Sequence, residues 1–186
     1  METKMRGRLK KKRKQLNNKG FSLLELIIVI AIIAVVTVAT MIGITVLSKG
    51  NAKKMNKNLY SAISELKTST MAKSGTWRMT IGKSGNEYVI NTYKDAEIIE
   101  SYSCSASRIK IKYDYEDNPD TAYSLDDNTL EIVFSRDDGS CKSVKAVEKD
   151  EELKSKDLSG EFIISASGQE YKSKIWYATG RVTTSN

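Results

Sequence analysis

The stretch that decides the fold begins with Gly20-Phe21-Ser22-Leu23-Leu24-Glu25 and continues as LIIVIAIIAVVTVATMIGITVL over residues 26–47. These 22 residues carry no charge, and their only polar side chains are three threonines, at positions 37, 40 and 45. A helix of that length measures about 33 Å, close to the roughly 30 Å hydrocarbon core of a bilayer. Because threonine hydroxyls can bond to the preceding turn of their own helix, the sequence predicts a membrane-spanning helix.

Basic charge is concentrated before this segment. The net charge of the 186 residues is +7, yet nine of the 30 Lys and Arg and only one of the 23 Asp and Glu lie in residues 1–20. Residues 21–186 therefore hold 21 basic and 22 acidic side chains and are almost neutral. Because Lys- and Arg-rich flanks stay cytoplasmic, we expect the C-terminal part to lie outside. A removable secretory signal is the alternative, although its apolar region would span only about 7–15 residues.

Glu25 is the unusual residue of the segment. A charged side chain costs about 2.5–3.5 kcal/mol near the centre of a bilayer and less toward its surface, so such a residue indicates a functional site. None of the next 23 residues is charged. We therefore expect the partner of Glu25 to be a chain terminus or a group on another molecule.

The sequence Lys19-Gly20-Phe21-Ser22-Leu23-Leu24-Glu25-Leu26, followed by a run of Ile, Val and Ala, resembles the prepilin cleavage and methylation motif of type IV pilins and type II secretion pseudopilins. The resemblance implies that a membrane-embedded prepilin peptidase cuts between Gly20 and Phe21, and that Phe21 becomes an N-methylated N-terminus. It also implies that Glu25 faces the Phe21 ammonium of a neighbouring subunit in a filament. The implied partners are prepilin peptidase, other pilin or pseudopilin subunits, and a membrane assembly platform with a cytoplasmic ATPase.

Helical periodicity continues beyond the apolar segment. Apolar side chains recur at steps of three and four from Ala52 to Leu66, with lysines on the other faces. This pattern predicts one helix from about Ser22 to about Lys73. Two helices hinged at residues 49–51 are the alternative.

After Gly75 the sequence changes to short β-rich runs separated by Gly, Asn and Asp. The predicted strands cover residues 77–81, 87–92, 98–103, 108–114, 130–135, 143–147, 162–167, 172–177 and 181–184. We expect an α+β fold, in which an antiparallel β-rich domain packs on the second half of the long helix. The expected parts are a cleaved cytoplasmic leader (1–20), a transmembrane and assembly helix (21–48), its amphipathic continuation (49–75) and an extracytoplasmic pilin domain (76–186). The strand Ile132-Val133-Phe134 leading to Gly139, and the ending Gly180-Arg181-Val182, resemble the globular domain of GspH/FimT-type minor pseudopilins.

Composition argues against an enzyme or a metal protein. The chain has no histidine, which excludes Ser-His and Cys-His nucleophile pairs and removes the commonest zinc ligand. Seven acids have no EF-hand spacing and are interpreted as solvated turns: Glu116, Asp117, Asp120, Asp126, Asp127, Asp137 and Asp138. The charged run at residues 148–152 is interpreted as an exposed loop. We expect no catalytic residues, no cofactor and no metal.

The two cysteines, Cys104 and Cys141, would both lie outside the membrane, where a disulfide can form. Two reduced thiols fit equally well, because sequence does not give the Cα separation that a disulfide requires. Near the C-terminus, Lys172, Lys174 and Arg181 are too few to predict nucleic acid as a partner.

The sequence thus predicts a pilin-like structural subunit, a minor pilin or pseudopilin of a pilus, type II secretion or competence system. It would begin as a single-pass protein of the cytoplasmic (inner) membrane and end in a cell-surface or periplasmic filament. The alternative is a signal-anchored cell-surface binding protein that does not polymerise. The mature N-terminus would distinguish the two hypotheses.

Overall fold

The computed structural model describes residues 21–115, 122–153 and 159–185. The chain divides into two compact units, residues 1–40 and residues 41–186. A single helix, α1 (Leu23–Ala72), contains 50 residues and ends within one residue of the predicted limit. It is continuous through residues 49–51, so the alternative of two hinged helices is wrong.

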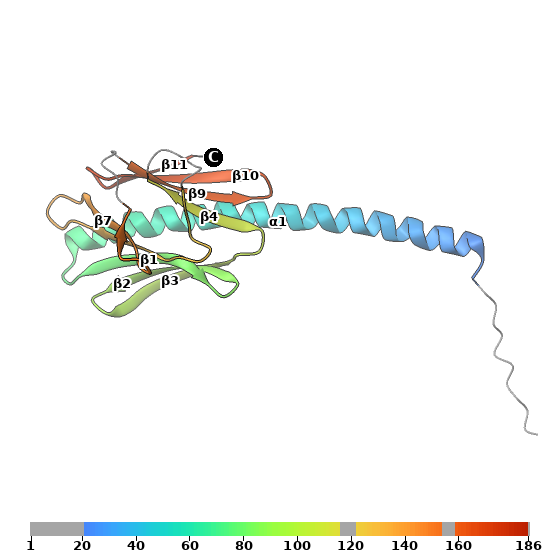
Figure 1. The fold of residues 1–186 in the computed structure, drawn as a ribbon, viewed down its shortest axis with the longest axis horizontal. Coiled ribbons are helices and arrows are strands. Elements are labelled where there is room, and N and C mark those ends of the chain that lie inside the picture. The colour runs from blue at the N-terminus through green and yellow to red at the C-terminus, as the bar shows by residue number, and fades with distance from the viewer. Residues whose placement is uncertain (1–20, 116–121, 154–158, 186) are drawn as a thin grey trace, which may run out of the picture. The chain divides into compact units, whose positions relative to one another are not determined.

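The rest of the second unit is built from two antiparallel sheets (Figure 1). Sheet A has the order β3 (Glu97–Ser105), β2 (Glu87–Lys94), β1 (Trp77–Ser84), β6 (Leu130–Phe134), β7 (Cys141–Ala146) and β8 (Glu151–Glu152). Sheet B has the order β11 (Arg181–Ser185), β10 (Gln169–Trp176), β9 (Ser159–Ala166), β4 (Ile109–Asp114) and β5 (Tyr123–Ser124). The α+β arrangement predicted from the sequence is confirmed.

The second half of α1 contributes a row of side chains to the core. Its buried positions recur every three or four residues, so they form a stripe along the helix: Ser48, Ala52, Met55, Asn56, Leu59, Ala62, Ile63, Leu66, Ser69 and Thr70. In Figure 1 this half runs between β1–β3 of sheet A and the strands of sheet B. The buried apolar residues of the helix and both sheets form one cluster.

Polar contacts fix the helix to sheet B. The Asn56 side chain accepts a hydrogen bond from Ser173 Oγ at 2.7 Å and donates to the Lys172 carbonyl at 3.4 Å. Near the end of the helix, Lys67 Nζ donates to the Thr179 carbonyl at 2.7 Å. Because Asn56 and Ser173 are both buried, losing either partner would leave an unsatisfied polar group in the core.

A close approach in sheet B depends on Gly160. The hydroxyls of Tyr113 and Tyr177 lie 2.7 Å apart, and a Cβ at Gly160 would overlap both of them. Burial raises the pKa of Tyr113 well above its ordinary value and raises that of Tyr177 to about 12. A glycine is needed at residue 160 because the two rings occupy the space that a side chain would fill.

All nine predicted strands are present, with ends shifted by a few residues. The two short strands β5 and β8 were not predicted. β8 corrects the interpretation of residues 148–152 as only a loop, because Glu151 and Glu152 pair with β7. The Glu152 carboxylate also accepts hydrogen bonds from Val144 N and Ser143 Oγ, at 3.0 and 2.9 Å.

Candidate functional site: the N-terminal end of the helix

The start of α1 brings Phe21, Ser22 and Glu25 into one turn of chain. The helix begins at Leu23, and the Leu26 N–H donates to the Ser22 carbonyl at 3.1 Å. Ser22 therefore occupies the N-cap position, and Glu25 lies in the first turn. An acid there stabilises the exposed N–H groups of a helix by roughly 0.3–1 kcal/mol, which is a structural role for Glu25.

That structural role leaves the Glu25 carboxylate without a charged partner. Among the residues that the structure describes, Glu25 makes no hydrogen bond or ion pair. Phe21 is also open, with 82% of its surface exposed. Both predicted site residues are therefore available to another molecule, while Gly20 lies outside the described residues.

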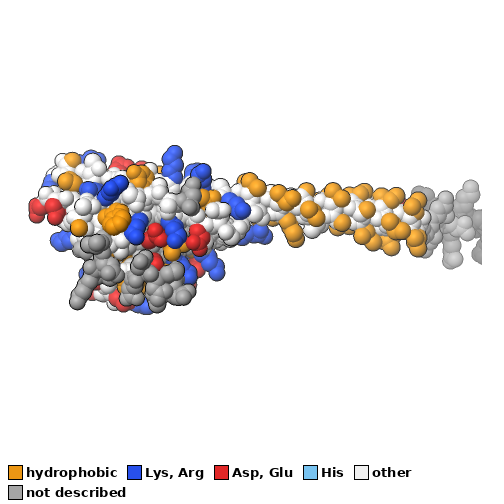
Figure 2. All heavy atoms as spheres, turned by 90° about the horizontal axis from the view of Figure 1, so that it is seen from above, with side chains coloured by type: hydrophobic (Ala, Val, Ile, Leu, Met, Phe, Trp, Pro, Cys, Tyr) orange, Lys and Arg blue, Asp and Glu red, His pale blue; other side chains and the backbone are white. Residues whose placement is uncertain are grey.

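The apolar segment that follows is exposed along its length. From Leu26 to Ile44 every residue is exposed, and Figure 2 shows hydrophobic side chains along the visible side of this stretch. Within the described residues, α1 is the one helix long and apolar enough to cross a membrane, judged by length and composition. It fits a single-pass membrane anchor.

The hydroxyl groups of the segment bond within the helix, as predicted. Thr37 Oγ1 donates to the Ile33 carbonyl at 2.7 Å, and Thr40 Oγ1 donates to the Thr37 carbonyl at 2.8 Å. Thr45 Oγ1 donates to the Met41 carbonyl at 3.0 Å. The three hydroxyls thus need no partner outside the helix.

Cys104 and Cys141 are both thiols and are not joined to each other. Cys104 is on β3 and Cys141 is on β7, with β2, β1 and β6 between them in sheet A. Four strand spacings amount to roughly 19 Å, well beyond the ~7 Å limit on Cα separation for a disulfide. Burial, followed by the charge of Glu87, raises the pKa of Cys104 to about 11, so this thiol is protonated at neutral pH.

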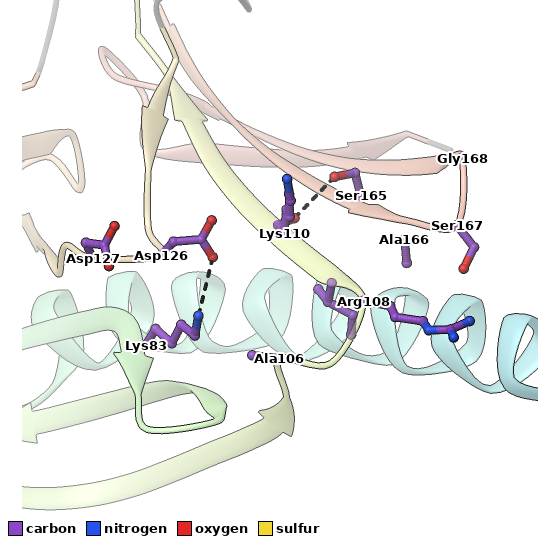
Figure 3. Close-up of a pocket in the computed structure, with 11 residues that line it drawn as sticks. Lys83, Ala106, Arg108, Lys110, Asp126, Asp127, Ser165, Ala166, Ser167 and Gly168 are labelled. Atoms are coloured by element: carbon purple, nitrogen blue, oxygen red, sulfur yellow. Dashed lines mark hydrogen bonds and ion pairs between the residues drawn. The ribbon is translucent and has the colours of Figure 1, made fainter.

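A polar cleft of about 590 Å³ opens between the ends of β1, β4 and β9 (Figure 3). Lys83 Nζ lies 3.8 Å from Asp126 Oδ1, and the buried Tyr88 hydroxyl donates to the same oxygen at 2.5 Å. Asp126 is therefore a structural partner of Tyr88, which corrects its interpretation as a solvated turn residue. Burial, followed by the bond to Asp126, raises the pKa of Tyr88.

The other polar side chains of the cleft do not point toward a common centre. Figure 3 shows the Arg108 side chain pointing away from Asp126, and the Ser165 hydroxyl is bonded to the Lys110 carbonyl at 3.5 Å. The charges that do meet, Lys83 and Asp126, compensate each other. The cleft therefore offers no convergent set of groups for a ligand.

The other predicted features lie elsewhere. In the described ranges no group of three or more His, Cys, Asp and Glu could hold a metal ion. Glu116, Asp117 and Asp120 lie outside those ranges. On sheet B, Lys172 pairs with Glu161 at 3.2 Å, Lys174 lies 5.2 Å from the centre of the Trp176 ring, and Arg181 is opposite Trp176.

Comparison with known protein families identifies the N-terminal region. Residues 15–41 match the family model described as the prokaryotic N-terminal methylation motif. This is a prepilin signature. The prepilin signature spans the predicted cleavage position, Phe21 and Glu25, and it implies processing by prepilin peptidase and assembly with other pilins. No curated protein and no solved structure matched the chain.

Proposed function

We propose that the chain is a minor pilin or pseudopilin, a structural subunit cleaved after Gly20, N-methylated at Phe21 and assembled into a filament through α1. One observation carries this proposal: the prepilin signature coincides with an exposed apolar helix whose acid, Glu25, has no partner among the described residues. Cleavage would create an ammonium group at Phe21, which is the charge that Glu25 lacks.

The charge pair gives a physical basis for filament register. Two opposite charges about 4 Å apart gain on the order of 4 kcal/mol at an effective dielectric constant of about 20. A comparable energy is lost when one buried charge has no partner. Within one chain, Phe21 lies only four residues before Glu25, which is about one helical turn. The Phe21 ammonium of a second subunit can therefore take the place of the subunit's own ammonium beside Glu25 only if the two helices are aligned along their axes to within about one turn.

The exposed apolar surface of α1 supports the same function. Soluble monomers seldom expose large contiguous apolar patches, so the segment from Leu26 to Leu47 requires lipid or other subunits around it. Membrane insertion satisfies this requirement before assembly, and neighbouring helices satisfy it in a filament. The same apolar surface thus serves both states.

In this proposal the subunit has no catalytic activity of its own. Prepilin peptidase performs the cleavage, and a membrane assembly platform with its cytoplasmic ATPase supplies the work. The globular unit is carried outside the cytoplasmic membrane and then into a cell-surface or periplasmic filament. Pilus, secretion and competence functions are compatible with such a subunit, and the GspH/FimT-like subclass stays a prediction.

The mature N-terminus tests the cleavage step. The full chain is expressed with and without a prepilin peptidase, and the membrane fraction is analysed by intact-protein and peptide mass spectrometry. We expect peptidase-dependent loss of residues 1–20 and one added methyl group on Phe21. A chain that keeps Met1, or that is cut at another position, would contradict the proposal and favour the signal-anchored surface protein.

Substitution of the acid tests the assembly step. We expect Glu25→Gln to be cleaved normally but incorporated into filaments at least about tenfold less, the effect of 1.4 kcal/mol. Glu65→Gln is the matched control, because Glu65 is an exposed acid on the second half of the same helix. Equal incorporation of both variants, measured by immunoblotting of sheared filaments, would refute the charge-pair role.

A further inference from the structure

Four lysines follow directly after the apolar segment of α1. We call Lys49, Lys53, Lys54 and Lys57 the lysine cluster. No acid occurs anywhere between residues 26 and 64, so these four charges have no compensating neighbour along the helix. In Figure 2, blue side chains lie next to the orange ones where the apolar stretch ends.

Three of the four lysines face away from the core of the second unit, and Lys49 is half-buried. Lys53, Lys54 and Lys57 are exposed, whereas Ala52, Met55 and the other buried positions lie on the opposite side of the helix. No lysine of the cluster makes an ion pair or a hydrogen bond with a residue that the structure describes. The ammonium groups are therefore available to an external anion.

The axial position of the cluster matches the surface of a membrane. At 1.5 Å per residue, Lys49 lies about 3 Å beyond Leu47 along the helix axis, and Lys57 lies about 15 Å beyond it. The polar headgroup layer adds roughly 5–7 Å on each side of the hydrocarbon core. Because lysine side chains extend along the helix toward the interface, Lys49, Lys53 and Lys54 reach this layer. Lys57 lies beyond it but within about one Debye length of the phosphates.

We propose that the lysine cluster binds the phosphate groups of anionic phospholipids in the leaflet next to the globular unit. Clusters of Lys and Arg directly beside a transmembrane helix are attracted to anionic headgroups, and the attraction is lost within a Debye length of the surface. The bound phosphates would fix how deep α1 sits in the membrane. The proposal requires α1 to lie in a membrane but requires neither cleavage nor polymerisation, so it can fail independently of the pilin function.

The other partner for such a surface would be a second copy of the chain. Anionic lipid is favoured because the cluster begins two residues after the apolar segment, whereas the nearest acid on the same helix, Glu65, is eight residues beyond Lys57. A phosphate layer is present wherever the apolar segment is inserted. An acidic surface on a second copy would have to be brought to the same position.

Local photo-crosslinking of the full chain tests the proposal. A photo-crosslinking amino acid replaces the exposed Asn51, which lies between Lys49 and Lys53, and the protein is reconstituted in nanodiscs. The lipid is phosphatidylcholine with about 30% phosphatidylglycerol, and mass spectrometry identifies the attached lipid. We expect phosphatidylglycerol to be enriched at least about threefold in the adduct over the nanodisc, and the enrichment to fall with added salt.

Charge-matched variants decide whether the cluster causes the enrichment. Replacing all four lysines of the cluster by Gln should reduce the enrichment to within about 1.5-fold of the nanodisc composition. The control replaces four exposed lysines of the sheets and their turns: Lys110, Lys112, Lys142 and Lys149. It removes the same charge and should keep the enrichment. An adduct at the nanodisc composition, an enrichment that survives loss of the cluster, or crosslinks to a second copy in place of lipid would each overturn the proposal.

Discussion

The two halves of α1 belong to one helix but have opposite surroundings. In the first half Ile33 keeps 59% of its surface exposed, whereas in the second half Leu59 is completely buried. Apolar residues surround the first half on all sides, and they form a stripe on the second half. In both halves the local sequence is compatible with a helix. The distribution of apolar residues around that helix determines whether lipid or protein covers it.

The largest expected effect comes from truncating one buried and one exposed aliphatic side chain. Leu59→Ala should lower the free energy of unfolding of the globular unit by about 2–5 kcal/mol, because it leaves a cavity in a closed core. Ile33→Ala should change it by less than about 0.5 kcal/mol. Urea unfolding in detergent micelles, followed by the near-ultraviolet circular dichroism of Trp77 and Trp176, measures both. Equal losses would show that the halves do not differ as described.

Two glycines sharpen the comparison. Gly160→Ala should destabilise the globular unit by about 1–3 kcal/mol, because the new Cβ collides with two tyrosines that are buried and bonded to each other. Gly50→Ala in α1 should instead stabilise the helix by up to about 1 kcal/mol, since nothing lies within 4 Å of a Cβ at that position. The same unfolding assay should give shifts of opposite sign. Shifts of the same sign would contradict the packing at Gly160.

The smallest expected difference between the two halves of α1 and their surroundings is their response to high pH. The unfolded state loses the Tyr177 proton near pH 10 and the folded state only near pH 12, so stability is complete below pH 10 and falls as the pH rises through this window. The loss from Tyr177 should be at most about 1.4 kcal/mol per pH unit. Residues 26–48 carry no titratable side chain, so the helical signal of the first half should persist.

Tyr177→Phe should reduce this pH dependence, and Tyr60→Phe, at an exposed position of α1, is its control. Unfolding measured between pH 9 and 11 checks both variants. An identical slope in Tyr177→Phe and the unsubstituted chain would show that burial of this hydroxyl does not govern the loss.

Local patterns predicted the long elements of the fold. The stripe from Ala52 to Leu66 gave the second half of α1, and alternation gave strands such as β4 and β10. β5 and β8 contain two residues each, too few for a period of two to be recognised. They form only because neighbouring strands supply partners.

The candidate site could be proposed from the sequence because its residues are close together in the chain, and the roles of the individual residues stay predictions. Phe21 and Glu25 are recognised from one short motif and need no knowledge of the fold. Contacts between distant residues were not predictable. Glu148 accepts a hydrogen bond from Thr129 N at 2.8 Å, 19 residues away, and Tyr88 donates to Asp126 over 38 residues. In the sequence such acids look like ordinary charged turn residues. Their hydrogen-bond partners depend on how the strands pair, which local patterns do not give.

The threonine hydroxyls of the apolar segment have a consequence for movement. Thr37, Thr40 and Thr45 bond to carbonyls of their own helix, so every polar group in the segment stays satisfied whatever surrounds it. Passing from acyl chains to protein neighbours then breaks no hydrogen bond and requires no water to enter. The segment can therefore exchange lipid for protein neighbours without a cost in hydrogen bonds. Only the charged groups at its two ends are affected by the transfer.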